Sequence, residues 1–562
     1  MTGLEAAFER IGEAVERHLP TTHAPGLALA VSDLEDILGV VVRGFADVAA
    51  QKPVRLETRF EIGSISKSFA AICVMQELEA GRLDLDARVN DLLPWLELQE
   101  PFEPIRLHHL LTHTSGLAIG TEESPTGPGA MAIARGQAPT FAPGDRFFYS
   151  NDGYKLVGAV LEQVTGTAVA DLIEERILGP LEMSSTQARI TNETRLDIAV
   201  GYEPVFDDRP ESLRHPLAPA TWTVSETADG AIVSTVTDMS AYARMLLGRG
   251  SAVVGGREVR LLSEDSFTRM VEGGVDMHDE ELPDGRYGLG LWTYRRDGRR
   301  FIEHSGGMVG YTALLSLDVD TGLGCIALQN GPGGKGPVVE HAIDVVRASL
   351  RGGTPPPLPE LDPHAIKEAA SLAGRYVGAR SIELVAQGAG LRLLDGDVSV
   401  ELERWSDEKD AFCVSHPSWD RFLLRAVRDG AGAVGELVHG PDRFAPEGRE
   451  LSSPVQLPAE RMPFPGLYRS NDPWAIALVV FERAGGLFAT WPREGEEHPL
   501  IPLDDGSFAV GEEWQPRRLR FEEILDGRAA IVWFNGGRWY RAAESQAPVA
   551  TDAQAGVRLG SR

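Results

Sequence analysis

Ser64 and Lys67 form an S-x-x-K pair at the expected start of a helix, within the stretch FEIGSISKSFAAICVMQELEAGR. That helix is predicted to begin near Ser64 and to end at Gly81, a favourable C-cap residue. Residues three apart share a helix face, so the lysine ammonium can approach the serine hydroxyl. A serine becomes a good nucleophile only beside a base, and a desolvated lysine can serve as one. The helix N-terminus also offers N–H groups to an oxyanion.

Lysine is rare in this chain, which lowers the chance that the pair arose by accident. The six lysines are Lys52, Lys67, Lys155, Lys335, Lys367 and Lys409. A second S-x-x-K, from Ser406 to Lys409, lies in the charged turn RWSDEKDAF and has no helix pattern behind it. We expect that copy to be a solvated loop and the copy at Ser64 to be the reactive one.

Two further motifs follow. Tyr149-Ser150-Asn151 is the only Y-x-N in the chain and lies between an expected loop and a helix. A phenol can act as general base or acid if a cation lowers its pKa, and an asparagine amide can bond substrate and a catalytic side chain together. His304-Ser305-Gly306-Gly307 lies on an expected strand, where glycines let a substrate backbone come close. Tyr149 follows Ser64 by 85 residues, and His304 follows Tyr149 by 155.

Other candidate residues give weaker signals. His113, in the sequence HTSG, is expected to fix a turn rather than to catalyse. His108 and His109 lie on an expected helix and are interpreted as packing or surface residues, because no third metal ligand is spaced with them. Trp222 and Trp292 fit site lining and core packing equally well. The absence of a GxSxG sequence argues against an α/β-hydrolase.

The first 350 residues contain the helices and strands that must position these motifs, with strands near both ends and helices between them. Residues 1–20 have a helical pattern, and 26–48 predict two strands joined by a polar turn. Residues 105–250 are mainly helical, strands return over 287–330, and a helix follows them. This order predicts a mixed α/β domain in which both ends build one sheet around a helical insertion.

The composition and the predicted elements change after residue 350. The segment 351–364 is rich in proline and predicts an extended linker. Short alternating strands with glycine turns follow, and Gly374-Arg375-Tyr376 is matched 92 residues later by Gly466-Leu467-Tyr468. We interpret this as a duplication that gives two small antiparallel β-barrels. The predicted domains are a catalytic domain over 1–350, barrels over 365–455 and 456–545, and a tail over 546–562.

Composition narrows the function classes. The 562 residues predict several domains, and 54 basic against 83 acidic residues give a net charge of −29. Such a surface repels phosphate backbones and anionic lipids, which argues against nucleic-acid and membrane partners. Three distant cysteines, Cys73, Cys325 and Cys413, are expected to pack as small apolar residues. The first twenty residues lack a signal-peptide pattern, so a cytoplasmic location is expected.

With its three motifs in this order, the sequence resembles the serine β-lactamase and penicillin-binding protein superfamily. Supporting stretches are LHHLLTHTSGL, GAIVSTVTDMSAYARMLL and YGLGLW, all within about the first 350 residues. The resemblance implies an antiparallel sheet beside a helical domain with the site between them. It implies that Ser64 is acylated, that Lys67 and Tyr149 share general base and acid work, that Asn151 holds substrate, and that Gly307 joins Ser64 in the oxyanion hole. It implies neither metal nor organic cofactor.

His304 departs from the lysine that usually opens the third motif. Histidine is largely neutral at pH 7, so recognition of a substrate carboxylate is weakened. The H-x-G form and the duplicated tail resemble the three-domain D-aminopeptidases, in which two lipocalin-like β-barrels follow the catalytic domain and a barrel loop reaches the site. We therefore expect a serine hydrolase that cleaves a small peptide or amide, with His304 among its catalytic residues.

The prediction leans towards an aminopeptidase-like enzyme, with specificity for D-residues as an option and a homo-oligomer left open. One alternative is an esterase with weak or no β-lactamase activity. A second alternative is a non-enzymatic sensor that keeps the penicillin-binding fold.

Overall fold

The computed structural model describes residues 3–120, 138–279, 282–405, 408–452 and 455–542. Two compact units emerge. The first holds residues through Glu203 together with Pro219–Glu360, and the second holds Pro204–Ala218 together with the chain from Leu361 onward. The predicted tail over 546–562 and the predicted barrel end at 545 lie outside the described residues. The predicted boundaries at 350, 364 and 455 stay predictions.

A nine-stranded antiparallel sheet forms the centre of the first unit. Its strands, in spatial order, are β10 (Val275–Asp276), β11 (Arg286–Tyr287), β12 (Trp292–Arg296), β13 (Arg299–Met308), β14 (Tyr311–Asp318), β15 (Leu323–Gln329), β1 (Gly26–Ser32), β2 (Ile37–Asp47) and β3 (Lys52–Pro53). The prediction that both ends of the region build one sheet is confirmed, because β1 pairs with β15 on one side and with β2 on the other.

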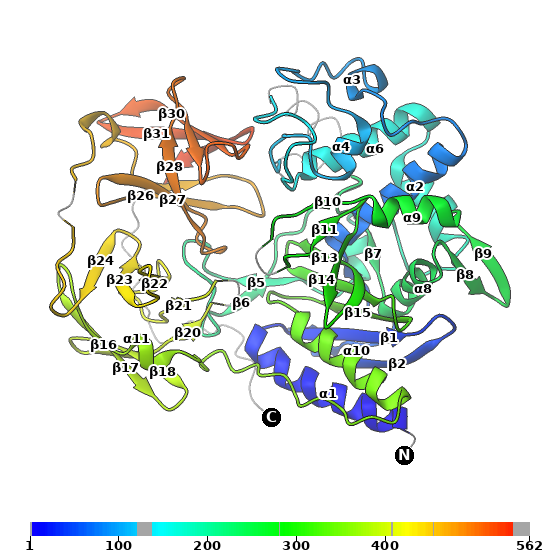
Figure 1. Ribbon diagram of the computed structural model, residues 1–562, viewed down its shortest axis with the longest axis horizontal. Coiled ribbons are helices and arrows are strands. Elements are labelled where there is room, and N and C mark those ends of the chain that lie inside the picture. The colour runs from blue at the N-terminus through cyan, green and yellow to red at the C-terminus, as the bar shows by residue number, and fades with distance from the viewer. Residues whose placement is uncertain (1–2, 121–137, 280–281, 406–407, 453–454, 543–562) are drawn as a thin grey trace. The chain divides into compact units, whose positions relative to one another are not determined.

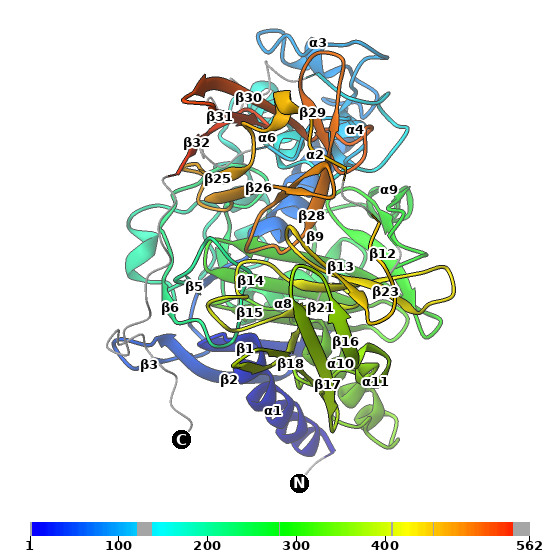
Figure 2. The same cartoon turned by 90° about the vertical axis from the view of Figure 1, so that its left-hand side faces the viewer.

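Helices cover both faces of this sheet. Those of the first unit are α1 (Gly3–Thr22), α2 (Ser66–Glu79), α3 (Val89–Leu92), α4 (Leu107–Leu111), α6 (Asn151–Thr165), α7 (Val169–Ile173), α8 (Val236–Leu247), α9 (Glu264–Glu272) and α10 (Gly336–Leu350). In both views α1 lies below the sheet, whereas α2 and α4 lie above it (Figures 1 and 2). The helical insertion between the two sets of strands is therefore confirmed.

Strand β1 shows why this sheet needs two covered faces. All seven residues of GLALAVS are buried. Leu27 and Leu29 join the core with α1 and α10, while Ala28 and Ala30 join the core with α2 and α8. A strand with both faces buried shows a continuous apolar run instead of alternation, and this sequence has such a run.

The second unit contains two antiparallel sheets of similar size. One has nine strands in the order β19 (Val398–Glu401), β18 (Gly390–Asp395), β17 (Ser381–Gln387), β16 (Gly374–Val377), β24 (Asp442–Pro446), β23 (Val434–His439), β22 (Leu424–Arg428), β21 (Ala411–Cys413) and β20 (Glu403–Arg404). Its outermost strands, β19 and β20, are consecutive in the chain, so this sheet is nearly closed.

The other sheet is a closed barrel, which confirms the prediction of barrel domains after the catalytic region. Its strands are β25 (Gly466–Arg469), β26 (Ala477–Arg483), β27 (Gly486–Thr490), β28 (Glu497–Pro502), β29 (Phe508–Val510), β30 (Arg518–Leu525), β31 (Arg528–Phe534) and β32 (Gly537–Arg541). A short helix, α11 (Ala369–Leu372), precedes β16 of the nearly closed sheet.

The two matched tripeptides occupy equivalent places in these sheets. Tyr376 on β16 and Tyr468 on β25 are both buried. The Tyr376 hydroxyl donates to the carbonyl of Leu372 at 2.8 Å, and the Tyr468 hydroxyl donates to that of Phe464 at 2.6 Å, four residues upstream in each case. Each first strand also pairs with the last strand of its own sheet. The repeated contact supports the duplication predicted from the sequence.

Neither a membrane span nor a metal cluster emerges from the described residues. Among them, no single helix combines the length and apolarity needed to cross a bilayer, although the bent pair Asn151–Thr165 and Val169–Leu178 meets the criterion jointly. No group of three or more His, Cys, Asp or Glu side chains in the described ranges is arranged to hold a metal ion. All three cysteines are buried and free, as expected for small apolar residues.

Candidate active site

Ser64 lies in a short 3₁₀ helix, η1 (Gly63–Ile65), which runs directly into α2. The helical start was predicted at Ser64; the α-helix itself begins at Ser66 and ends at Glu79. Between Phe60 and Met75, Ser64 is the one residue whose side chain is not buried. The fold therefore presents this single hydroxyl to solvent from an otherwise buried segment.

Glycines bring β13 against the backbone that carries Ser64. A Cβ added to Gly63, whose φ is +51°, would lie 2.4 Å from the Gly307 carbonyl oxygen. A Cβ added to Gly306 would lie 1.9 Å from the Ile62 carbonyl oxygen and 3.4 Å from the Ser64 nitrogen. The distances to the two carbonyl oxygens, 2.4 Å and 1.9 Å, are shorter than any side chain permits, so glycine is required at positions 63 and 306. The close approach places the Gly307 and Ser64 backbones next to each other.

Lys67 is completely buried on the first turn of α2. Its Nζ donates to the Ser64 Oγ at 3.0 Å and to the Asp229 carbonyl oxygen at 2.9 Å. The same Nζ lies 4.9 Å from the centre of the Tyr149 ring and 5.6 Å from that of Tyr154. The lysine is thus held between the serine hydroxyl and the aromatic ring of the second motif, as the S-x-x-K spacing predicts.

His113 fixes the backbone on both sides of Tyr149. Its carbonyl accepts the Phe148 N–H at 2.8 Å, and its Nδ1 accepts the Ser150 N–H at 3.0 Å. Its imidazole packs against the Tyr149 ring with centroids 4.1 Å apart. His113 has a φ of +56°, and burial, followed by the Lys67 charge, holds its pKa well below the usual range. The histidine is therefore neutral and fixes a turn, the turn that carries Tyr149.

Tyr154 and Tyr287 surround the same cluster but differ from Tyr149 in burial. Both are fully buried, and burial raises the pKa of each phenol well above its ordinary value. The Tyr154 hydroxyl donates to the Leu111 carbonyl oxygen at 2.8 Å. Tyr149 is only half-buried. Among the three phenols, Tyr149 is therefore the one suited to exchange a proton with a substrate.

His304 lies on β13, as predicted, with its side chain buried beneath the strand and 1% exposed. Its Nε2 is 2.9 Å from the Tyr287 hydroxyl, and its Nδ1 is 2.5 Å from the Ser305 carbonyl oxygen. The carbonyl can only accept, so Nδ1 carries the proton and Nε2 accepts from the phenol. Burial, followed by the Lys67 charge, lowers the pKa of His304 to about 3. The imidazole is neutral, and its burial favours a positioning role.

Ser305, the neighbour of His304, is exposed. Strand alternation explains the difference, because successive side chains point to opposite faces. Asn151 is the first residue of α6, where Ser150 caps the helix by accepting the Gly153 N–H at 3.1 Å. Among the described residues, the Asn151 Oδ1 has no hydrogen-bond partner. The structure thus brings Ser64, Lys67 and Tyr149 together and sets Gly307 beside Ser64.

Sequence reasoning missed two contributors to this cluster, Tyr287 and the Asp229 carbonyl, and left Trp292 open between site lining and core packing. Tyr287 and Trp292 come from YGLGLW, and both pack against His304, the Trp292 ring at 4.5 Å between centroids. The Asp229 carbonyl, from the segment GAIVSTV and its flank, holds Lys67. The aromatic residues were visible in the sequence as a supporting stretch, whereas a carbonyl acceptor leaves no sequence signal. His109 caps α4 by accepting the Arg106 N–H at 3.0 Å, which fits its interpretation as a packing residue.

Comparisons with known proteins agree with this geometry. The family model described as Beta-lactamase matches residues 11–348. "Penicillin-binding protein 4" of Amycolatopsis lactamdurans is 28% identical over 63% of this chain and 93% of its own length. "D-aminopeptidase" of Brucella anthropi is 26% identical over 59% of this chain and 61% of its own length.

Among solved structures, the octameric penicillin-binding protein homologue from Pyrococcus abyssi matches with a TM-score of 0.56 and 25% identity. That match covers 78% of this chain and 99% of the homologue. The matched family region contains the S-x-x-K, Y-x-N and H-x-G motifs and the whole nine-stranded sheet. The chain therefore belongs to the beta-lactamase family.

Proposed function

We propose that this chain is a serine hydrolase that cleaves small amides or peptides through an acyl-enzyme at Ser64. The observation that carries the proposal is the 3.0 Å hydrogen bond between the Lys67 Nζ and the Ser64 Oγ. Within residues 60–75, Ser64 has the only side chain that is not buried. The family and its D-aminopeptidase member from Brucella anthropi favour amide hydrolysis. We propose an aminopeptidase-like preference, with D-residues as candidate substrates.

In the first step the Ser64 Oγ attacks the substrate carbonyl carbon and gives its proton to the Lys67–Tyr149 pair. The carbonyl oxygen gains the negative charge, and the N–H groups of Ser64 and Gly307 are the proposed donors to it. Donors fixed in advance stabilise such an oxyanion without reorganisation. The proposal draws support from the close packing of Gly63 and Gly306, which sets the two backbones side by side.

In the second step the carbon–nitrogen bond breaks, and the amine leaves with the proton that Lys67 and Tyr149 return. Water then attacks the acyl carbon and gives a proton to the same pair, the bond to the Ser64 Oγ breaks, and the pair returns the proton to that Oγ as the acid is released. Each proton taken is returned, so the enzyme ends as it began. His113 contributes by holding Tyr149 in place, and the Asn151 amide is proposed to bind the substrate carbonyl or amide.

The state of His304 bears on substrate choice. A neutral imidazole donating to the Ser305 carbonyl offers no positive charge to a substrate carboxylate. Substrates that lack a carboxylate near the scissile bond are therefore favoured over C-terminal carboxylates and β-lactams. The same argument supports the second candidate, an esterase with weak or no β-lactamase activity. We propose His304 as a positioning residue in either case.

The experiment is a substrate panel of D- and L-aminoacyl amides, p-nitrophenyl esters and a chromogenic cephalosporin. Amidase activity on aminoacyl amides that disappears in Ser64→Ala supports the proposal. Ester turnover far above that of every amide supports the esterase instead. Full activity in Ser64→Ala contradicts both, and the absence of any turnover or acylation favours a non-enzymatic sensor. Gel filtration tests whether the chain forms a homo-oligomer, which the sequence leaves open, and fractionation tests the expected cytoplasmic location.

A further inference from the structure

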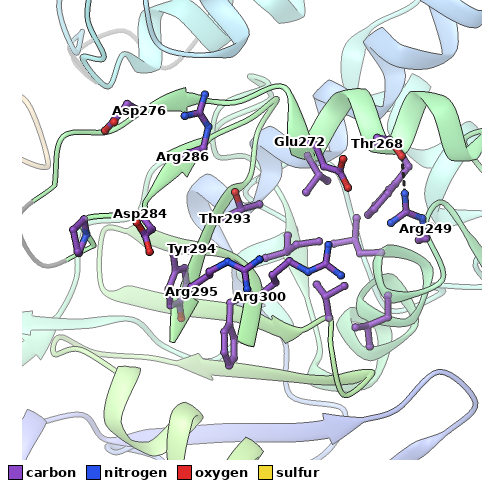
Figure 3. Close-up of a pocket in the computed structure, with 18 residues that line it drawn as sticks. Arg249, Thr268, Glu272, Asp276, Asp284, Arg286, Thr293, Tyr294, Arg295 and Arg300 are labelled. Carbon is purple, nitrogen blue, oxygen red and sulfur yellow. Dashed lines mark hydrogen bonds between the residues drawn. The ribbon is translucent and has the colours of Figure 1, made fainter. Parts of the chain in front are cut away.

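A cavity of about 600 Å³ lies in the first unit between the end of α8, helix α9 and strands β10–β13 (Figure 3). We call it the arginine cavity. None of the predicted site residues is among those that line it. Its volume lies within the range of small-molecule sites, which is about 300–1,000 Å³. The cavity is therefore large enough for a ligand and separate from Ser64.

The floor of the arginine cavity is apolar. Leu246 and Phe267 contribute from α8 and α9, and Phe301 and Ile302 contribute from β13. All four side chains are buried, with exposed fractions of 4% or less. A ligand with an aliphatic or aromatic body would remove its own apolar surface from water by resting on this floor.

Guanidinium groups enter the cavity from separate elements. Arg249 follows α8, Arg295 lies on β12 and Arg300 lies on β13 (Figure 3). Arg249 donates to the Thr268 Oγ1 at 2.6 Å, and the Arg300 Nε donates to the Asp320 Oδ1 at 3.0 Å. These contacts hold the two groups in place.

The anchoring contacts leave most of the hydrogen-bonding capacity of these arginines unused. A guanidinium carries five N–H donors. Among the described residues, the hydrogen bond of Arg249 to Thr268 uses one donor, and that of Arg295 to the Gly298 carbonyl oxygen, at 2.9 Å, also uses one. Fixed guanidinium groups with remaining donors are suited to a carboxylate, which they can bind with two parallel hydrogen bonds.

Charge within the cavity contrasts with the rest of the chain. The lining holds four arginines against three acidic residues, whereas the chain carries a net charge of −29. Asp276 and Asp284 lie at the left of Figure 3, whereas the third acidic residue, Glu272, lies beside Thr268 on the side of Arg249. Glu272 and Asp320, the partner of Arg300, offset the positive charge at this end, so recognition of an anionic head group depends on the guanidinium donors of Arg249 and Arg300.

We propose that the arginine cavity binds a small organic anion, a carboxylate carried on an aliphatic or aromatic body. The carboxylate lies between Arg249 and Arg300, and the body covers Phe267 and Ile302. The site is independent of the chemistry at Ser64, so its existence does not depend on the proposed hydrolase activity.

The test is calorimetric titration of the full chain, carrying Ser64→Ala to prevent turnover, with octanoate as the probe. One saturable site is expected, and octanamide, which has the same body and no charge, should bind at least about tenfold more weakly. Arg249→Gln and Arg300→Gln should each weaken octanoate binding about tenfold, because each removes charge-assisted hydrogen bonds. Arg257→Gln, on the exposed β9 hairpin outside the cavity, is the matched control and should bind as the parent does.

Two further measurements keep the result decisive. Thr293→Trp fills the cavity from β12 and should abolish binding even if an arginine variant proves unstable. A wild-type chain whose Ser64 is blocked by a fluorophosphonate should bind octanoate unchanged. The proposal is overturned by equal affinity for octanoate and octanamide, by unchanged binding in folded Arg249→Gln and Arg300→Gln, or by loss of binding when Ser64 is blocked.

Discussion

The first unit buries Lys67, Lys155 and Lys335 to nearly the same depth, and a comparison of Lys67 with Lys335 shows that burial alone does not make a lysine reactive. Lys67 is 0% exposed and Lys335 is 5% exposed. The Lys67 Nζ meets a serine hydroxyl that reaches solvent, whereas the Lys335 Nζ donates to the Gly333 carbonyl oxygen at 3.3 Å. Burial lowers the pKa of Lys335 to about 7, and burial together with the Lys335 charge lowers that of His18 to about 4. Burial alone can thus favour the neutral form of an amine, which can accept a proton, without giving it a nucleophile to activate.

The largest effect is expected for Lys67→Met. This change removes the base from Ser64 while keeping an unbranched side chain, and kcat/KM should fall about 10³-fold, within the range of lost general base catalysis. Lys409→Met is the matched control from the second S-x-x-K, since Lys409 is exposed and pairs with Glu368 at the surface. Steady-state kinetics of both variants measures the two kcat/KM values. Equal values would show that the S-x-x-K at Ser64 is no more important for activity than the one at Ser406.

Lys335→Met should act on stability and spare activity. Between pH 7 and 10.5 the unfolded chain binds a proton on Lys335 that the folded chain does not, so the wild type becomes more stable as pH rises. The methionine variant lacks this penalty, and its free energy of unfolding should exceed that of the wild type by up to about 4 kcal/mol at pH 7. The gain should shrink towards pH 10.

Urea unfolding at pH 7 and pH 10, with kinetics at pH 7, measures both quantities. A loss of activity comparable to that of Lys67→Met would show that Lys335 also serves the reaction and would break the comparison.

His113→Asn tests how the surroundings of Lys67 are built. Asparagine tolerates the φ of +56° but cannot reproduce the imidazole that packs on Tyr149 and accepts the Ser150 N–H. A Tyr149 that is free to shift should lower kcat about ten- to hundredfold with little change in KM. Because the pKa of His113 is well below its usual range, the acid limb of the pH–rate profile should stay in place. A displaced limb would mean that His113 itself titrates in the reaction.

Ser305→Ala is expected to have the smallest effect. Ser305 is exposed on β13 beside buried His304, where its hydroxyl can contact a substrate. Losing one neutral hydrogen bond should raise KM about two- to tenfold and leave kcat nearly unchanged. Steady-state kinetics on the best substrate of the panel separates the two constants. A large fall in kcat would instead place this hydroxyl in the chemical step.

The sequence predicted which helices and strands carry the motifs, because hydrophobic patterns and residue spacings over a few residues determine these local elements. The pattern over 26–48 predicted two strands, and the three-residue spacing predicted that Lys67 would reach Ser64. The matched tripeptides at 374 and 466 predicted two similar β-structures. Each of these inferences depends on contacts between sequence neighbours or on direct repetition.

Local sequence patterns could not predict how deeply a side chain is buried or which distant residues it contacts. Nothing near Lys335 in the sequence distinguishes it from a surface lysine, because neighbours such as His18 on α1 lie more than 300 residues away in the chain. The segment 204–218 lies within the predicted catalytic domain, yet it belongs to the second compact unit, where Arg209 pairs with Asp420 and Asp207 pairs with Arg469. Pairs separated by more than 200 residues are set by the fold as a whole.

The central claim is that Ser64 is the one nucleophile and that Lys67 activates it. Intact-mass spectrometry after treatment with a fluorophosphonate, followed by peptide mapping, tests it most directly. The account predicts a single adduct on Ser64 that forms quickly in the wild type and in Lys409→Met, slowly in Lys67→Met, and never in Ser64→Ala. An adduct on another residue, or labelling at the wild-type rate in Lys67→Met, would contradict it.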